Sequence, residues 1–319
     1  MFNELPLDLD TVLDLLLDGT QLYVACRNNR LFVYDVGMPT ALPVEIVLQS
    51  IPVSLATSPQ GCLVGCSDGS VRIVDSENFK ADEVLCVGEG VVNFVRYMKN
   101  EQRVLATTIA GDIITSSIRT GETHKLRTSS KIFCADATDE VVVLGLAGAR
   151  IQIYNSYDLS QPRETKELGT IHQVRSIRCL PNSLGYSLAT LDGRVSLEYF
   201  QDPLANFTFK CHRVIDRATK TDEVFSINAL VFADDSETLY TGGGDGTVCV
   251  WNCQKRKRTR IYPQFSTKNN RAVSVAKIFI AGDVLAVAVS DDSYIRATDT
   301  QPWAPQYPSK VYTRNLRDL

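Results

Sequence analysis

The residues that could bind a metal ion are cysteines in two closely spaced pairs. The 319-residue chain has nine cysteines, and three residues separate Cys62 from Cys66 and Cys249 from Cys253. Zinc sites in proteins usually need four ligands, and no histidine cluster lies near either pair. Most of the nine lie in apolar, strand-like stretches. We therefore expect buried, reduced thiols and neither a metal nor another cofactor.

Catalysis would require a nucleophile, a base or a phosphate-binding loop in a recognisable arrangement. The chain has three histidines and lacks the Gly-x-Ser-x-Gly, Gly-x-x-x-x-Gly-Lys and His-Glu-x-x-His patterns. The glycines at 242–246 lie between two apolar stretches, which indicates a tight turn. Asp192 and Asp245 each precede a glycine in a hairpin, where an Asp side chain commonly bonds its own backbone. We therefore predict that the protein is not an enzyme.

Basic residues offer a different chemistry, the binding of carboxylates or phosphates. One run comprises Lys255, Arg256, Lys257, Arg258 and Arg260. It directly follows a strand-like segment, which favours a solvated outer strand over a nucleic-acid or acidic-protein site. Arg194 lies outside this run. It follows Asp192-Gly193 and comes shortly before the segment NFTFKCHR (206–213), so two regions of one blade bring cations near each other.

These residues lie within an internal repeat. An apolar strand, a small or polar turn and a second strand recur at 22–35, 62–75, 104–117, 142–155, 186–199 and 239–252. The period of roughly 40 to 45 residues is typical of a β-propeller, and the longer interval between Asp192 and Asp245 indicates an insertion. Asp-Gly at 68–69, 192–193 and 245–246 predicts antiparallel hairpins with type I′ turns, in which both central residues have positive φ.

Further apolar runs precede the hairpins and supply an innermost strand for each unit. They lie at 53–59, 92–98, 132–138, 174–180 and 227–233, and the segment 12–19 also favours a strand over a helical turn.

A seventh unit begins at 272–292, and its next strand is either 293–299 or 310–316. We prefer 310–316, because the prolines at 302, 305 and 308 indicate an irregular connection before it. Residues before Asp8 could supply the outer strand of this unit and so close the ring. We thus expect an all-β, seven-bladed propeller, closed by pairing of the N- and C-terminal strands, with residues 1–319 forming a single domain.

Composition is that of an ordinary globular protein, with 44% hydrophobic and 22% charged residues. The net charge of −4 and pI near 5.5 argue against a protein that binds mainly to a nucleic-acid backbone. The N-terminus lacks the pattern of a signal peptide, and no apolar stretch is long enough for a membrane helix. We expect a location in the cytosol or nucleus and no association with membranes.

Four segments carry a family resemblance: 187–200, 206–213, 225–232 and 239–252. They resemble the WD-repeat propellers of the spindle-checkpoint Bub-three family and its paralogues, the nuclear-pore messenger-RNA-export propellers of the Rae and Gle group. The detailed match covers roughly residues 170 to 295. Glu198 and the segment 283–293 favour the checkpoint branch in its fungal form, whereas NFTFKCHR is at least as similar to the export branch. The first-blade Ser-Trp-Asp element of the family is replaced here by Cys26-Arg27-Asn28.

The resemblance implies a non-catalytic adaptor with two binding activities. One is capture of a GLEBS segment from a checkpoint kinase or pseudokinase, and the other is reading of phosphothreonine in Met-Glu-Leu-Thr repeats of the kinetochore scaffold, which would recruit the kinases. We assign Arg194 to contact with a partner glutamate or phosphate, and Lys210 and Arg213 to the phosphopeptide pocket. His212 is less suited to binding, because propeller histidines often bond internally.

The same resemblance implies a monomeric subunit of a hetero-complex in the nucleus and at the kinetochore, with no direct contact to nucleic acid. The export branch, which remains open as an alternative, implies a nucleoporin GLEBS segment and RNA as partners.

Overall fold

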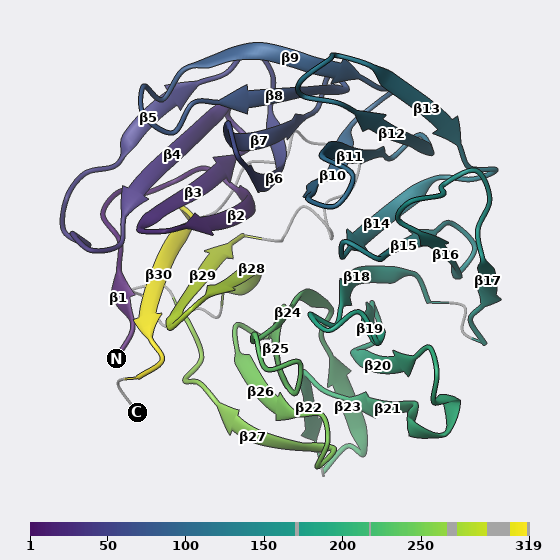
Figure 1. Cartoon of the computed structure of the whole chain (residues 1–319). Coiled ribbons are helices and arrows are strands. Elements are labelled where there is room, and N and C mark those ends of the chain that lie inside the picture. Colours follow the sequence, from purple (N-terminus) through teal and green to yellow (C-terminus); the bar gives the residue numbers. More distant parts are fainter. Residues whose placement is uncertain (170–171, 217, 267–272, 292–306, 318–319) are drawn as a thin grey trace, which may run out of the picture.

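The computed structural model describes residues 1–169, 172–216, 218–266, 273–291 and 307–317. Within these residues, seven four-stranded antiparallel sheets stand around a central axis as the blades of a propeller (Figure 1). The predicted all-β, seven-bladed architecture is confirmed.

Each blade is named here from its innermost to its outermost strand. Blade 1 is β2 (Val12–Asp18), β3 (Gln21–Cys26), β4 (Arg30–Asp35) and β5 (Val44–Val47). Blade 2 is β6 (Pro52–Ser58), β7 (Gly61–Cys66), β8 (Ser70–Val74) and β9 (Ala81–Val87). Blade 3 is β10 (Val92–Met98), β11 (Arg103–Thr108), β12 (Asp112–Ser116) and β13 (Thr123–Arg127). Blade 4 is β14 (Ile132–Ala137), β15 (Val141–Leu146), β16 (Arg150–Asn155) and β17 (Glu164–Glu167).

Blade 5 is β18 (Val174–Cys179), β19 (Gly185–Thr190), β20 (Arg194–Tyr199) and β21 (Phe207–Lys210), with a short 3₁₀ helix η1 (Pro203–Ala205) before the last strand. Blade 6 is β24 (Ile227–Phe232), β25 (Thr238–Gly243), β26 (Val248–Asn252) and β27 (Lys257–Ile261). Blade 7 is β28 (Ser274–Ala281), β29 (Val284–Ser290), β30 (Lys310–Asn315) and β1 (Asn3–Glu4). A separate hairpin of β22 (Arg213–Asp216) and β23 (Thr221–Val224) lies between blades 5 and 6.

Burial changes from the inside of a blade to its rim. Every residue of β7, β15 and β19 is buried, because a second strand is covered on both faces by the neighbouring blades. Such strands are near-continuous apolar runs, unlike the alternating pattern of a half-exposed strand. The outermost strands β13 and β27 are exposed along their whole length. The core therefore lies between the blades.

The turns at the Asp-Gly dipeptides differ from the predicted type. Gly69, Gly193 and Gly246 have φ of +88°, +67° and +76°, but the aspartates before them do not have positive φ. The N–H of Gly69 donates to the carbonyl of Cys66 at 3.3 Å, and the other two glycines make the equivalent bond. The loops therefore have three residues, a type I turn followed by a left-handed glycine. The prediction of type I′ turns was wrong, whereas the hairpins themselves are confirmed.

Blade 7 joins the two ends of the chain. Asn3 of β1 pairs with Thr313 of β30, and β30 pairs in turn with β29, so the predicted strand at 310–316 and the ring closure are confirmed. Leu5, only 1% exposed, packs into the core beside these strands. The rejected alternative at 293–299 and the prolines at 302 and 305 lie outside the described residues.

Candidate functional site

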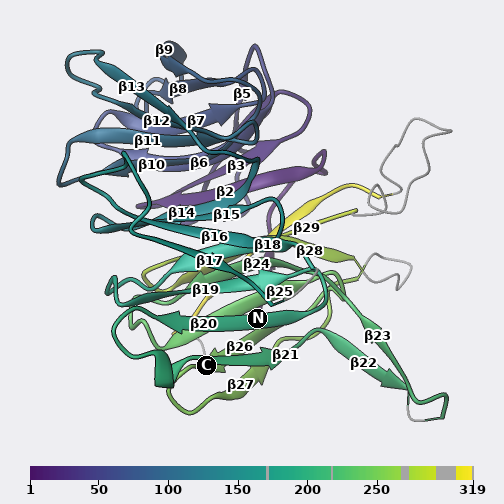
Figure 2. The same ribbon diagram turned by 90° about the vertical axis from the view of Figure 1, so that its right-hand side faces the viewer.

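The two faces of the propeller carry different connections between strands. Because neighbouring strands of a blade run in opposite directions, the turns between second and third strands and the connections between blades lie on one face. We call it the Asp-Gly face, after the turns at 68–69, 192–193 and 245–246. The β22–β23 hairpin is the insertion expected between Asp192 and Asp245, and it projects beyond the blades on this face (Figure 2).

The three cations predicted from the sequence meet at one corner of the Asp-Gly face. Arg194 begins β20 and lies opposite Lys210, the last residue of β21. Arg213 begins β22 and donates a hydrogen bond from its Nη2 to the backbone carbonyl of Asp192, 2.7 Å away. We call Arg194, Lys210 and Arg213 the basic corner.

Asp192 is the anion at the centre of this corner, a role that the sequence did not suggest. Its carboxylate accepts hydrogen bonds from Thr190 Oγ1 at 2.5 Å and from Arg194 Nε at 2.7 Å. Burial acts to raise the pKa of Asp192, but the bonds from Thr190 and Arg194 and the charges of His172 and Arg194 outweigh it, so the pKa is lowered. Asp192 thus stays ionised and holds Arg194 by its Nε, while 44% of the Arg194 side chain remains exposed.

The other two cations differ in how far they are open to a ligand. The Arg213 side chain is only 14% exposed, and its Nη1 lies 3.5 Å from Asp222 of β23, so Arg213 ties the hairpin to the Asp192 turn. The Lys210 side chain is exposed, and its ammonium forms no hydrogen bond or ion pair with any residue in the described ranges. Lys210 and Arg194 are therefore the cations that a ligand reaches directly.

His212 lies between Lys210 and Arg213 in sequence but points into the protein. It is 3% exposed, and its ring nitrogens bond to Asp245 Oδ1 at 2.9 Å and Thr241 Oγ1 at 2.8 Å. Trp251 Nε1 also donates to Thr241 Oγ1, at 3.2 Å. The expectation that His212 bonds internally is confirmed. This chain links the connection before β22 to three positions of blade 6.

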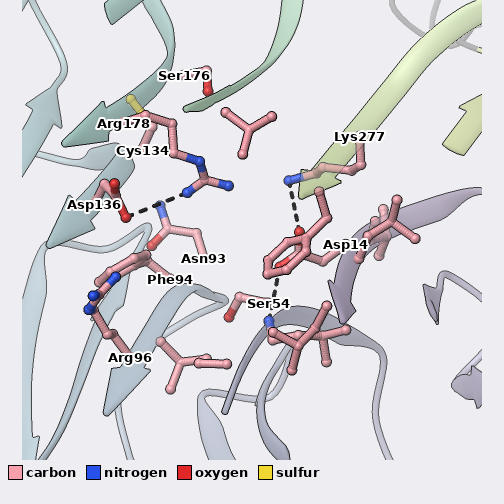
Figure 3. A pocket seen from close by; sticks show the side chains of 18 of the residues that line it. Asp14, Ser54, Asn93, Phe94, Arg96, Cys134, Asp136, Ser176, Arg178 and Lys277 are labelled. Atoms are coloured by element: carbon pink, nitrogen blue, oxygen red, sulfur yellow. Dashed lines mark hydrogen bonds and ion pairs between the residues drawn. The ribbon is translucent and has the colours of Figure 1, made fainter. Parts of the chain in front are cut away.

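The central channel is a concave feature of the part of the chain that the structure describes. It has a volume of about 860 Å³ and is lined by the innermost strands (Figure 3). Two of its cations are paired: Lys277 lies 3.5 Å from Asp14, and Arg178 lies 3.5 Å from Asp136. The channel thus presents two charge pairs, while Arg96 and Arg175, which also line it, form no ion pair in the described ranges.

Polar side chains of the channel join each innermost strand to the next. One link occurs at every seam between blades: Leu55 N to Asp14 Oδ2 (2.9 Å), Ser54 Oγ to Val92 O (3.1 Å), Asn93 Nδ2 to Ile132 O (2.8 Å), Cys179 N to Asp136 Oδ2 (2.7 Å), Arg178 Nε to Leu230 O (3.0 Å), Asn228 Nδ2 to Val275 O (3.0 Å), and the ion pair of Lys277 with Asp14 (3.5 Å). The channel residues thus hold the ring together.

The cysteine thiols, like the channel side chains, have structural roles. All nine cysteines are free; eight are buried, as predicted, and Cys134 is half-buried beside the channel. Burial raises the pKa of the Cys134 thiol to about 12, and that of Cys86 to about 11, which keeps both protonated at neutral pH. Among the described residues, no group of three or more His, Cys, Asp or Glu side chains is placed to hold a metal ion.

Comparison with known proteins places these features in a family. A family model described as WD domain, G-beta repeat, matches residues 207–252. Spindle assembly checkpoint protein bub3 of Schizosaccharomyces pombe is 27% identical over 303 residues, 91% of this chain and 92% of that protein. Mitotic checkpoint protein BUB3.1 of Arabidopsis thaliana is 30% identical over 193 residues, 59% of this chain and 53% of that protein. The mRNA export factor GLE2 of Chaetomium thermophilum is 27% identical over 183 residues, 57% of this chain and 49% of that protein.

This chain is a WD40 propeller related to Bub3 and Gle2. The alignments with the Arabidopsis and Chaetomium proteins span about half of each relative, and that with the S. pombe protein spans nearly all of it. Because both a plant and fungi supply relatives, the fungal affinity expected from residues 283–293 is not established.

The family relationship agrees with the geometry. The matched stretch 207–252 runs from β21 to β26 and contains all four residues of the buried chain, His212, Thr241, Asp245 and Trp251. Bub3-like WD40 propellers are scaffolds, a group that is generally non-catalytic, and here the channel and the thiols have structural roles. No helix in the described part of the chain has the length and apolar character needed to cross a membrane.

Proposed function

We propose that this protein is a non-catalytic adaptor of the spindle assembly checkpoint. In this proposal it binds GLEBS segments of checkpoint kinases or pseudokinases, reads phosphothreonine in Met-Glu-Leu-Thr repeats of a kinetochore scaffold protein, and so recruits the kinases to kinetochores in the nucleus. The relationship to Bub3 over most of the chain supports the checkpoint role.

The observation that carries the phosphopeptide proposal is the basic corner. A phosphate group brings a charge of about −1.5 to −2 and three acceptor oxygens, which arginine and lysine bind through charge-assisted hydrogen bonds. Lys210 offers an exposed side chain, and Asp192 orients the guanidinium of Arg194 through its Nε while 44% of that side chain remains exposed. In the proposed pocket, Arg213 adds positive charge and fixes the turn at Asp192 through its bond to the Asp192 carbonyl.

The test is titration calorimetry with a phosphorylated Met-Glu-Leu-Thr peptide and its unphosphorylated twin, with and without a bound GLEBS segment. We expect binding that requires the phosphate. Lys210→Gln should weaken it about five- to tenfold and leave the melting temperature unchanged, because the Lys210 ammonium forms no hydrogen bond or ion pair in the described ranges. Arg213→Gln should weaken binding and also lower the melting temperature, because Arg213 holds both Asp192 and Asp222.

Lys220→Gln is the matched control, since Lys220 is another exposed lysine on the same face, in the β22–β23 hairpin. Its affinity for the phosphopeptide should equal that of the wild type. If Arg194→Gln and Lys210→Gln also retain full affinity, the assignment of the basic corner is wrong.

The export branch is the second candidate, supported by the similarity to the Chaetomium mRNA export factor. In that case the partners would be a nucleoporin GLEBS segment and RNA. GLEBS binding without phosphate dependence, together with RNA affinity that falls steeply with salt, would favour this function over the checkpoint role.

A further inference from the structure

Another cavity opens on the face opposite the Asp-Gly face, which is the face away from the β22–β23 hairpin (Figure 2). The turns between first and second strands, and those between third and fourth strands, lie on this opposite face. The cavity has a volume of about 400 Å³, and turns of this kind from blades 3, 4 and 5 line it. It shares no residue with the basic corner, so the functional site described above does not account for it.

The wall of this cavity, here called the acidic pocket, carries more negative than positive charge. Three carboxylates line it, those of Glu101, Asp139 and Glu140, together with one guanidinium, that of Arg163. None of the four forms an ion pair with a residue in the described ranges. The Arg163 guanidinium is instead held over the ring of Phe200, 4.4 Å from its centroid. Three charges of −1 and one of +1 leave the wall with a formal balance of −2.

Glu101 has the least support from hydrogen-bond donors within the protein. Its Oε1 lies 3.2 Å from Ser156 Oγ, but that hydroxyl has a single hydrogen and lies closer, at 2.6 Å, to the carbonyl oxygen of Asp139. Glu101 Oε2 is shielded from solvent and has no hydrogen-bond partner. A shielded carboxylate oxygen without a donor costs free energy, which a cation in the pocket would offset. The unsupported carboxylate therefore points to a positively charged ligand.

Apolar side chains stand exposed at the rim of the acidic pocket. Tyr157 is 77% exposed and Leu184 is 50% exposed, and both line the cavity. The face of the Tyr157 ring is suited to a cation, as the face of the Phe200 ring is to Arg163. The pocket thus combines carboxylates with aromatic and aliphatic surface, which suits a ligand that has a charged end and an apolar stem.

The arrangement distinguishes between a metal ion and a basic side chain. A metal ion needs ligands that converge on one point, and no group of three or more His, Cys, Asp or Glu side chains among the described residues does so. An arginine side chain is longer: its stem can pack on Tyr157 and Leu184, and its five N–H donors can reach carboxylates that are spread around the pocket. We propose that the acidic pocket binds an arginine side chain, followed by an apolar residue, in an exposed segment of a partner protein.

The test is an NMR titration of the isotope-labelled full chain with the peptide Gly-Ser-Arg-Leu-Ser-Gly. A second peptide carries citrulline in place of arginine, which keeps the shape of the side chain and removes its charge. We expect the arginine peptide to shift the backbone amide signals of Tyr157 and Leu184, and to bind at least about tenfold more tightly than the citrulline peptide. Equal affinity of the two peptides, or shifts confined to other parts of the propeller, would overturn the proposal.

Variants of the pocket separate binding from folding. The double variant Glu101→Gln, Glu140→Gln keeps the length of both side chains and should weaken binding of the arginine peptide about tenfold, since two charge-assisted contacts are lost. Tyr157→Ala should weaken it about threefold through loss of the ring face, with an unchanged melting temperature because the side chain is 77% exposed. The matched control, Glu77→Gln with Asp234→Asn, removes two exposed carboxylates of blades 2 and 6 on the same face and should bind as the wild type does.

Two competitors complete the experiment. The phosphorylated Met-Glu-Leu-Thr peptide, at saturation, should leave the affinity for the arginine peptide unchanged, because the basic corner lies on the opposite face; this site is thus tested independently of the proposed function. An equal loss of affinity in the control variant would attribute binding to the net charge of the chain and overturn the proposal. Calcium ions that produce the same shifts as the arginine peptide would also overturn it, and would identify the pocket as a metal site.

Discussion

Four side chains from separate parts of the sequence meet inside blade 6, where His212, Thr241, Asp245 and Trp251 form one hydrogen-bonded chain. Burial acts to raise the pKa of Asp245, but the bond and charge of His212 and the bonds from Thr247 outweigh it and lower the pKa. The folded protein therefore favours the ionised carboxylate. The ionised Asp245, in the turn between β25 and β26, is thus linked to His212 in the connection before blade 6.

Replacement of this carboxylate should make stability depend on pH in a defined direction. Asp245→Asn keeps the shape and the acceptor for His212 but removes the charge, and we expect a loss of about 1–2 kcal/mol at neutral pH. Because the folded pKa is lowered, the charge stabilises the protein fully above the unfolded value of about 3.9 and progressively less as the pH falls toward the folded value. Thermal unfolding of both proteins at pH 7, 4 and 3 should show a gap that narrows in acid. A gap of constant size would contradict this account.

At the scale of elements, the second strands determine how closely blades approach each other. Gly242 of β25 is an example: a Cβ there would lie 2.5 Å from Val275 Cγ1 and 2.8 Å from Ile278 Cδ1, both on β28 of the next blade. Gly65 of β7 and Gly145 of β15 meet the following blades in the same way. A hydrogen atom as side chain thus permits the close contact that the seam requires.

Gly242→Ala should destabilise the protein by about 1–3 kcal/mol, because the added methyl group overpacks the seam between blades 6 and 7. Chemical denaturation monitored by tryptophan fluorescence would measure the change. Gly169→Ala is the matched control, since nothing lies within 4 Å of a Cβ at that exposed position and its φ is not positive. A similar loss in both variants would point to a general effect of alanine and against the seam.

The sequence predicted these elements well and their local geometry less well. Apolar runs and Asp-Gly dipeptides located the three inner strands of the blades, because burial and turn chemistry are encoded in short stretches. They did not place the outermost strands of blades 1 to 5, which are largely exposed. The predicted turn type, I′, was wrong. The residues before Asp68, Asp192 and Asp245 do not pair in the ladder, so each loop has three residues instead of two. Where the pairing stops is decided by the neighbouring strands. Likewise, the assignment of Arg194, Lys210 and Arg213 followed from their place in the segments that carry the family resemblance. The longer interval between Asp192 and Asp245 indicated an insertion, but not that its hairpin would bring Asp222 to Arg213.

At the scale of the whole molecule, the ring is closed twice. On the outside, β1 pairs with β30, and Lys310 Nζ lies 2.6 Å from Asp8 and 2.9 Å from Glu4. Around the channel, one polar link crosses every seam between neighbouring innermost strands, including the ion pair of Lys277 with Asp14 that joins the last blade to the first. Both ends of the chain are therefore held in blade 7, and blade 7 is joined to blade 1.

Leu5 and Leu7 offer a direct measure of this closure. Leu5 is 1% exposed beside β30, whereas Leu7, two residues later, is 41% exposed. Leu5→Ala should cost about 2–4 kcal/mol through the cavity that it leaves, and Leu7→Ala should change the free energy of unfolding by less than about 0.5 kcal/mol. Urea unfolding of the two variants would test this. Comparable losses would indicate that the N-terminal segment contributes to stability without packing into blade 7.

The pairing of β1 with β30 also has a consequence for how the protein is made. Strand β1 (Asn3–Glu4) is synthesised long before its partner β30 (Lys310–Asn315), with the other blades in between. A nascent chain that ends before Lys310 holds several assembled blades with an unpaired strand at each end, the kind of exposed edge that promotes aggregation. Closure is thus the most non-local step of folding, and a chaperone that shields strand edges would be needed most until Lys310–Asn315 has been synthesised.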